Sequence, residues 1–315
     1  GCGGASGPPS KVPDETLRAA VSGLLPALDP HNWTNALGPR TLAPLFDGLT
    51  FIQSDGKLRP ALANAWAQKE PTVWEFRLRV SDAKFHTGEL FTPESVQFTF
   101  ERLANAQLPL SKLASGVARI DILDPATINI VTREPDANLP RWLSAIYMLP
   151  PKYFGQVGER GFVEQPVGTG FWMMDDFQPG SHLHLNVYRD TWRGTRGAMA
   201  PPPIKRLELE VMPQAGDRIE ALRALNIDVA TELTPQEAGS LQATGFAAET
   251  DNLGQLNADD AGWQTAAFGA PLSTGQSAFA TPANVKGVTA LPNGSWWFDR
   301  VTKTAMQRVA VAGGA

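Results

Sequence analysis

The sequence is short of cysteine, of charge and of long apolar runs, and each shortage excludes a class of protein. Cys2 is the one cysteine among 315 residues, so an internal disulfide framework and CxxC metal or redox motifs are excluded. Charged residues make up 19% of the chain and the net charge is −5. This argues against nucleic acid as a partner, because proteins that bind it carry a basic surface. No uncharged apolar stretch approaches about 18 residues, the length that predicts a membrane-spanning helix.

The common catalytic signatures are also missing. The sequence has no GxxxxGK[ST], HExxH or GxSxG motif, so the phosphate loop, the zinc-protease helix and the hydrolase elbow are not expected. Gly168-Thr169-Gly170 begins like GxGxxG, but Met173 takes the place of the third glycine, and we interpret the segment as a tight turn. Asp175 and Asp176 are neighbours in the chain, so in a strand their side chains would point apart. We expect no enzymatic activity, a hydrolase being disfavoured, and no cofactor.

Histidine offers one weak metal-binding pattern. His182 and His184 are two residues apart in an alternating segment, so both side chains share one face of a strand. This spacing can chelate a metal, but no cysteine or third histidine is near in the sequence. We therefore favour a solvated strand face and expect no metal site. His31 and His86 are isolated and are interpreted as structural.

Apolar periodicity predicts a mixed α/β (α+β) fold without internal repeats. Strands are predicted over residues 16–22, 72–80, 181–189, 204–212 and 227–230, with two more between 118 and 132 joined at Asp124-Pro125. Helices are predicted over residues 39–49 and 138–148, after the Thr92-Pro93-Glu94 start, and from Asp217 to a left-handed end at Asn226. Trp74 is assigned to a strand, and Trp66 and Trp142 to helix packing.

Trp33 stands out among the nine tryptophans. It lies between Asn32 and Thr34 in a proline-bounded loop that follows the first predicted strand. An apolar ring beside hydrogen-bonding groups suits a ligand pocket, and a ring that plugs the domain surface fits the sequence equally well. We expect Trp33 to face a ligand and to pack into no core.

The two ends of the chain differ in composition from its body. Cys2 is followed by a flexible tether of glycine, serine and proline, and Gly1-Cys2 matches the end of a bacterial lipobox, whose cysteine is acylated. The alternative is a frayed terminus with a free thiol. Between residues 252 and 298 only Asp259, Asp260 and Lys286 are charged. This stretch is either a poorly ordered tail or a segment foreign to what precedes it.

Ten short motifs occur in a characteristic order and spacing. They are LDPH at 28–31, LFDGL at 45–49, DGKLRPALA at 55–63, WEFRLR at 74–79, KFHTG at 84–88, FTPESV at 91–96, PPKY at 150–153, PVGTG at 166–170, RDTW at 189–192 and NIDVA at 226–230. Over about residues 14–235 the chain resembles the extracellular solute-binding proteins of family 5. These are the oligopeptide-, dipeptide- and nickel-binding components of ABC importers.

The resemblance implies a periplasmic-binding-protein type II-like fold. It divides the chain into a lipoprotein tether (1–13), a first lobe (14–251) that includes an inserted subdomain (about 50–165), and a divergent C-terminal segment (252–315). The implied partners are a peptide or peptide-like solute, ABC permease subunits, and a bacterial membrane reached through a lipid anchor on Cys2. The implied protein is an extracytoplasmic monomer. The implied ligand-binding residues are Asn32, Trp33, Thr34, Asn35, Ala36, Thr231, Glu232 and Leu233.

The resemblance weakens toward the C-terminus. Leu253-Gly254-Gln255-Leu256-Asn257 resembles the start of the family's next motif only weakly, and no match is seen after it. A second lobe is therefore expected to be largely missing, which keeps a truncated, non-transporting remnant as an alternative function. A metal- or metal-chelate-binding (nickel-type) member of the same family is the other alternative.

The tether yields a prediction about membrane attachment. In the native bacterium, Cys2→Ser should move the protein from the membrane fraction to the soluble fraction, because two acyl chains on Cys2 would give stable anchoring. Cell fractionation and immunoblotting measure this. Equal membrane association of both forms would contradict the lipoprotein interpretation.

Overall fold

The computed structural model describes three long stretches of the chain and several short strands. The described residues are 15–53, 56–192, 204–250, 278–281, 285–286, 289–290, 296–297 and 302–303. Cys2, the tether and most of the segment after residue 250 lie outside them, so the expectations placed there are not tested. Among the described residues, no helix has both the length and the apolar character needed to span a bilayer.

The largest sheet has seven strands in the order β12-β13-β11-β1-β10-β9-β8. Their bounds are Ala247–Thr250 (β12), Ala278–Thr281 (β13), Val229–Leu233 (β11), Thr16–Val21 (β1), Arg206–Val211 (β10), His182–Val187 (β9) and Trp172–Gln178 (β8). β1 runs parallel to β10, with Thr16 opposite Arg206, and parallel to β11, with Ala20 opposite Ala230. The other neighbours in this sheet are antiparallel. The three parallel strands therefore end at one edge of the sheet.

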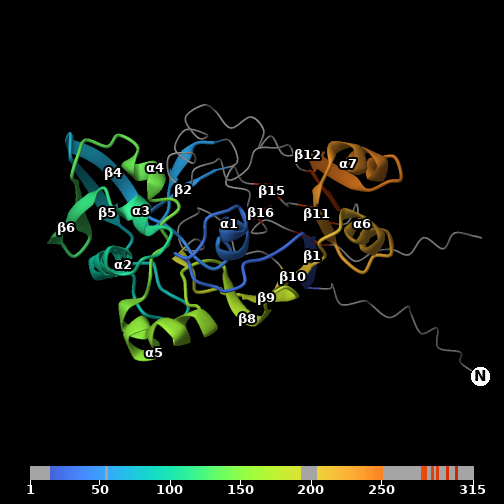
Figure 1. The fold of residues 1–315 in the computed structure, drawn as a ribbon, viewed down its shortest axis with the longest axis horizontal. Helices are drawn as coiled ribbons and strands as arrows, with labels where there is room; N and C mark the ends of the chain where they lie inside the picture. Colours follow the sequence, from blue (N-terminus) through green and yellow to red (C-terminus); the bar gives the residue numbers. More distant parts are fainter. Residues whose placement is uncertain are drawn as a thin grey trace, which may run out of the picture.

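A second, four-stranded antiparallel sheet lies within the expected inserted subdomain and forms the far end of the molecule in Figure 1. Its order is β4-β5-β7-β6, with bounds Ala63–Glu70 (β4), Val73–Leu78 (β5), Thr127–Thr132 (β7) and Val117–Asp124 (β6). The remaining strands form pairs: Thr50–Ile52 (β2) with Leu58–Pro60 (β3), Val285–Lys286 (β14) with Thr302–Lys303 (β17), and Thr289–Ala290 (β15) with Trp296–Trp297 (β16). The predicted β6–β7 hairpin is confirmed. The helical assignment of Trp66 is wrong, because Trp66 lies in β4, where its ring stacks on Phe76.

Seven helices occur in the described residues. Their bounds are Leu37–Leu42 (α1), Pro93–Asn105 (α2), Ser111–Ala114 (α3), Leu139–Trp142 (α4), Pro151–Glu164 (α5), Ala215–Arg223 (α6) and Pro235–Gln242 (α7). The predicted start of α2 is confirmed: Thr92 precedes Pro93, and the Thr92 amide donates to Ser95 Oγ at 3.2 Å in a capping box. Helices α6 and α7 lie beside β11 and β12 at the opposite end from the four-stranded sheet (Figure 1).

Three predicted helix details are wrong, each for a local reason. The helix expected over 39–49 ends at Leu42, because Pro44 has no N–H to continue it. The helix expected over 138–148 ends at Trp142; the Met148 amide instead donates to the Asp47 carbonyl oxygen at 3.0 Å, a tertiary contact that outweighs helix propensity. At the end of α6, Leu225 rather than Asn226 takes the left-handed conformation, with φ 60°.

One large hydrophobic core joins the two sheets. Leu17 of β1, Leu185 of β9 and Phe76 of β5 are fully buried members of it. Leu183 and Leu185 alternate with the two histidines in β9 and are fully buried, which agrees with the alternating segment expected at residues 181–189. A smaller core, which includes Ala20 and Leu222, lies under α6 and α7. The large sheet is therefore covered by the main core on one face and by these two helices at its β11 end.

A buried cluster around Arg102 of α2 ties the loop after β1 to the subdomain. The Arg102 guanidinium donates to Asp29 at 2.9 and 3.1 Å, to Glu159 of α5 at 2.6 to 3.2 Å, and to His31 Nδ1 at 2.9 Å. Burial opposes the charge on Asp29, but the hydrogen bonds and positive charge of Arg102 hold the pKa of Asp29 below its usual value. Burial, followed by repulsion from Arg102, lowers the pKa of His31 to about 4. His31 is therefore neutral and donates from Nε2 to the Tyr147 carbonyl oxygen at 2.9 Å.

His86 is held neutral by a second enclosed site at the Gly168-Thr169-Gly170 turn. Its Nδ1 accepts from the Gly168 amide at 3.2 Å, and its Nε2 donates to the Gly170 carbonyl oxygen at 3.1 Å. Gly168 packs so closely on the Leu45 carbonyl that a Cβ atom would clash with it. Desolvation lowers the pKa of His86 to about 4. His31 and His86 are both structural, as the sequence indicated.

The neutral histidines predict a pH-dependent stability. Between about pH 6.5 and 4 the unfolded chain binds a proton at His86 that the folded chain does not, so the free energy of unfolding should fall as the pH falls. The contribution of His86 is roughly 3 kcal/mol over this range. His86→Gln, which keeps a donor for Gly170, should show a shallower pH slope in urea unfolding, by about one proton. Equal slopes for both proteins would contradict a neutral, half-buried His86.

Candidate functional site

The candidate site lies where the parallel strands β11, β1 and β10 end. In open sheets with parallel strands, ligands bind in the crevice beyond the carboxyl ends of the strands, where the following loops diverge. Here the loop of residues 22–36 leaves β1, and Thr234 follows β11. The predicted segment 231–233 ends β11, and the predicted segment 32–36 follows in the loop from β1 and leads into α1, whose Arg40 forms an ion pair with Glu232.

The β1 loop presents polar side chains to solvent. Asn32, Thr34 and Asn35 are exposed, and Ala36 is half-buried. Asn35 Oδ1 accepts from the Leu37 amide at 3.0 Å, which fixes the loop at the start of α1. Amide and hydroxyl groups of this kind donate and accept hydrogen bonds but are not nucleophile–base pairs. The loop is suited to binding rather than to covalent chemistry.

Trp33 differs from its expected position. It is 3% exposed, belongs to the main core, and donates from Nε1 to the Pro30 carbonyl oxygen at 2.9 Å. The expectation that it packs into no core is therefore wrong. Its ring lies directly over Gly38, which is small enough to admit it. A tryptophan with a hydrogen-bonded N–H is stable in a core, so Trp33 anchors the loop from beneath.

The end of β11 is tied to β1 by side chains. Thr231 is buried and donates its hydroxyl to the Ala20 carbonyl oxygen at 2.9 Å, and Leu233 is buried in the smaller core. Glu232 between them has φ 56°, a left-handed conformation unusual for a residue with a side chain. Its carboxylate accepts from the Ser22 amide at 2.5 Å and forms an ion pair with Arg40 of α1. Strained residues of this kind cluster at functional sites.

Arg218 of α6 supports the same edge and was missed by sequence reasoning. Its guanidinium donates to the carbonyl oxygens of Met212, Pro213, Thr231 and Glu232 at 2.6 to 3.0 Å. Burial lowers the pKa of Arg218 below its usual value. An arginine on an amphipathic helix gives no sequence signal for such a role. Arg40 was missed for the same reason.

Comparison with known proteins was decisive for the family. The sequence profile of the bacterial extracellular solute-binding proteins, family 5, matches residues 57–269. The chain belongs to this family. The match also corrects the expectation that nothing after residue 257 resembles the family, since it continues to residue 269.

Relatives and solved structures agree with this assignment. The nickel-binding periplasmic protein of Escherichia coli K12 is 26% identical over 228 residues, covering 69% of this chain and 41% of that protein. NikZ from Campylobacter jejuni in complex with Ni(L-His) gives a TM-score of 0.65 at 21% identity, over 76% of this chain and 48% of that one. DppA from Helicobacter pylori in complex with the peptide STSA gives 0.67 at 19% identity, over 75% and 50%. The chain thus spans about half the length, or less, of the proteins it matches.

The packing of Trp33 on Gly38 predicts a coupled effect on stability. Trp33→Ala should lower the free energy of unfolding by about 3–5 kcal/mol, as for a core aromatic. Gly38→Ala should also be strongly destabilising, but much less so in the Trp33→Ala background, because the clash with the ring is removed. Urea unfolding of the two single variants and the double variant measures the coupling.

Gly216→Ala is the matched control. Gly216 lies in α6, where a Cβ atom meets nothing within 4 Å. This change should be neutral or slightly stabilising. Additive effects of Trp33→Ala and Gly38→Ala would contradict the packing described above.

Proposed function

We propose that this family 5 chain is the solute-binding component of an ABC importer and binds peptides or peptide-like solutes. The observation that carries the proposal is the set of exposed polar side chains Asn32, Thr34 and Asn35 in the loop that joins β1 to α1, together with the ion pair that ties α1 to Glu232 at the end of β11. A peptide backbone offers donors and acceptors that match amide and hydroxyl side chains. A bound peptide would be delivered to permease subunits in the membrane.

The predicted ligand-binding residues divide into two roles under this proposal. Asn32, Thr34, Asn35 and Ala36 contact the solute, since they are exposed or half-buried, whereas the Glu232 carboxylate is already bound by Arg40 and by the Ser22 amide. Trp33, Thr231 and Leu233 are buried and hold the wall in place. The ion pair between Glu232 and Arg40 fixes the distance between the end of β11 and α1.

Several relatives bind or transport peptides or peptide-like solutes, which favours such a solute here. DppA of Helicobacter pylori is described with a bound peptide, and a peptide transport periplasmic protein of Salmonella typhimurium, SapA, is 27% identical over 211 residues. Glutathione-binding proteins are 24% identical over 180 residues. These names describe binding rather than catalysis, which supports a non-enzymatic role.

A metal chelate is the second candidate solute. The observation in its favour is the similarity to the nickel-binding periplasmic protein and to NikZ with Ni(L-His). A chelate would occupy the same edge of the sheet as a peptide. The position of the site therefore does not distinguish the two candidates, and the test is which ligand, peptide or chelate, the purified chain binds.

Location and assembly follow from the same proposal. We place the chain outside the cytoplasmic membrane of a bacterium, as a monomer attached through lipid on Cys2. The support is the lipobox-like Gly1-Cys2 with its tether and the periplasmic location in the names of relatives.

Native mass spectrometry tests the solute. The purified chain is incubated with a pool of di- to pentapeptides and, separately, with Ni(L-His). We expect retention of peptides, and a loss of affinity of about tenfold in Asn32→Ala/Thr34→Ala, because two hydrogen bonds at roughly 0.5–1.5 kcal/mol each are removed.

Asn105→Ala is the control, since Asn105 is exposed at the far end of α2. It should bind peptides as the unaltered chain does. Retention of Ni(L-His) without any peptide would favour the chelate. Unchanged peptide affinity in the double variant would show that residues 32–34 are not part of the wall.

A further inference from the structure

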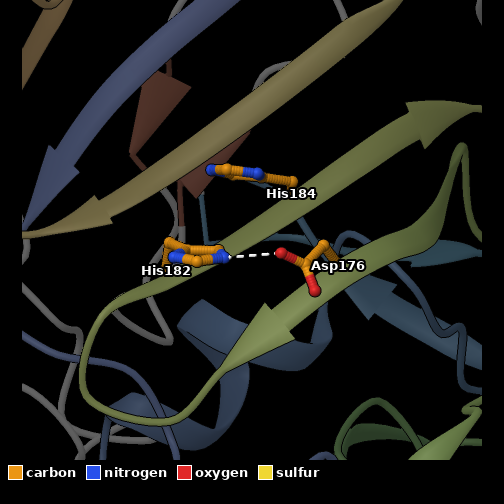
Figure 2. Close-up of side chains that lie close together, drawn as sticks. All are labelled: Asp176, His182 and His184. Atoms are coloured by element: carbon orange, nitrogen blue, oxygen red, sulfur yellow. Dashed lines mark hydrogen bonds and ion pairs between the residues drawn. The ribbon is translucent and has the colours of Figure 1, made fainter.

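The polar face of β8, β9 and β10 carries a cluster of imidazoles and carboxylates that the solute site does not use. His182 and His184 lie on the same face of β9, and their rings stack with centroids 4.2 Å apart. Figure 2 shows the carboxylate of Asp176 in β8 pointing toward the ring of His182 in the neighbouring strand β9. Asp176 Oδ2 is 2.8 Å from His182 Nε2, and Glu210 Oε1 of β10 is 2.7 Å from His184 Nε2.

A β-bulge brings the acidic residues of β8 to this face. Met174 pairs with Leu185 and Asp176 with His184, so Asp175 is the extra residue between them. A bulge re-aims the side chains beside it. As a result Asp175 contacts Asn186 and Arg206, while Asp176 contacts His182, all on the face of the two histidines. The expectation that Asp175 and Asp176 point apart is therefore wrong.

The charges of the cluster leave two carboxylates facing imidazoles. Arg206 is paired with Asp175 at 2.6 Å and with Glu208 at 2.8 Å, and Arg18 lies 3.4 Å from Glu208. In the contacts of the described residues, Asp176 and Glu210 instead meet His182 and His184. A cation placed beside Asp176 and Glu210 would be attracted by both carboxylates. Arg206, whose Nη2 also lies 3.3 Å from His184 Nδ1, would keep its own pairs with Asp175 and Glu208.

The donor atoms are close enough to share one ion. Those of Asp176, His182 and His184 lie within 4.8 Å of one another, as do those of His184, Glu208 and Glu210. Imidazole nitrogen together with carboxylate oxygen is a typical donor set for Zn²⁺. Ser181 Oγ lies 3.1 Å from His182 Nδ1 and can orient that ring. Histidines that bind a metal usually have such a hydrogen-bond partner at the ring nitrogen that does not bind the metal.

We propose that Asp176, His182 and His184 form a binding site for a divalent transition-metal ion, with Zn²⁺ as its probe. The ion replaces the hydrogen bond between Asp176 and His182, and a neutral ring that binds it through Nε2 carries its proton on Nδ1. Spacing along the chain argues against a metal site, because no cysteine or third histidine stands near the two histidines in the sequence. The third ligand, Asp176, comes from the neighbouring strand β8.

This site is separate from the proposed solute site. Its ligands lie on strands β8 and β9, whereas the solute site is built from residues 32–36 and 231–233. Zn²⁺ binding is measured without any peptide, so failure of one proposal does not decide the other.

Isothermal titration with ZnCl₂ tests the site, using the chain with Cys2 alkylated so that its thiol does not bind the metal. We expect one Zn²⁺ per chain and no comparable binding of Mg²⁺, which prefers oxygen ligands. His182→Gln, His184→Gln and Asp176→Asn should each weaken Zn²⁺ binding at least tenfold. Circular dichroism and thermal unfolding check that each variant folds.

Asn186→Ala is the matched control, because Asn186 lies on the same strand and face but outside the donor set. It should bind Zn²⁺ within about twofold of the unaltered chain. Absence of Zn²⁺ binding up to millimolar concentration would overturn the proposal. Unaltered Zn²⁺ affinity in the folded His182→Gln/His184→Gln variant would do the same, since the ion would then lie elsewhere.

Discussion

The buried guanidinium of Arg102 is the contact on which the position of the candidate site depends. It holds Asp29 and His31, which lie in the middle of the loop of residues 22–36, and Glu159 of α5 in one hydrogen-bonded cluster. Arg102 and Asp29 are both buried, so the loss of either one would leave a buried charge without its partner, which is strongly destabilising. The loop that carries Asn32, Thr34 and Asn35 is thereby fixed to the subdomain, and Trp33 secures its centre from below.

The end of β11, on the other side of the candidate site, is also held in place by arginine side chains. Glu232 adopts a left-handed backbone, which typically costs about 1–3 kcal/mol for a residue other than glycine. The ion pair with Arg40, the hydrogen bond from Ser22 and the carbonyl contacts of Arg218 offset this cost. Both walls are thus positioned by partly or fully buried arginines. Rigid walls of this kind reduce the ordering that a solute would otherwise have to bring about on binding.

The sequence predicted elements well where periodicity was strong and failed where tertiary contacts intervened. The alternation of β9 and the capping box of α2 were sufficient to place both elements. The 138–148 segment failed because Met148 pairs with Asp47, which no local pattern encodes. The candidate loop was found through the family motifs, whereas the burial of Trp33 depends on Gly38 being small. Arg40 and Arg102 were missed because their partners are distant in the chain, and Arg218 because its partners are backbone carbonyl oxygens, which no residue pattern marks.

The polar face of β8, β9 and β10 is the clearest case in which spacing along the sequence failed to predict which residues lie together. Along the chain, His182 and His184 have no further ligand nearby, and neighbouring aspartates on a regular strand would face opposite sides. One extra residue in β8 changes this, because the bulge at Asp175 brings Asp175 and Asp176 to the histidine face. The antiparallel register then sets Glu210 opposite His182 and Glu208 opposite His184. Strand pairing and the single register shift in β8 determine which donor residues share this face. Spacing along the sequence therefore does not predict the donor set.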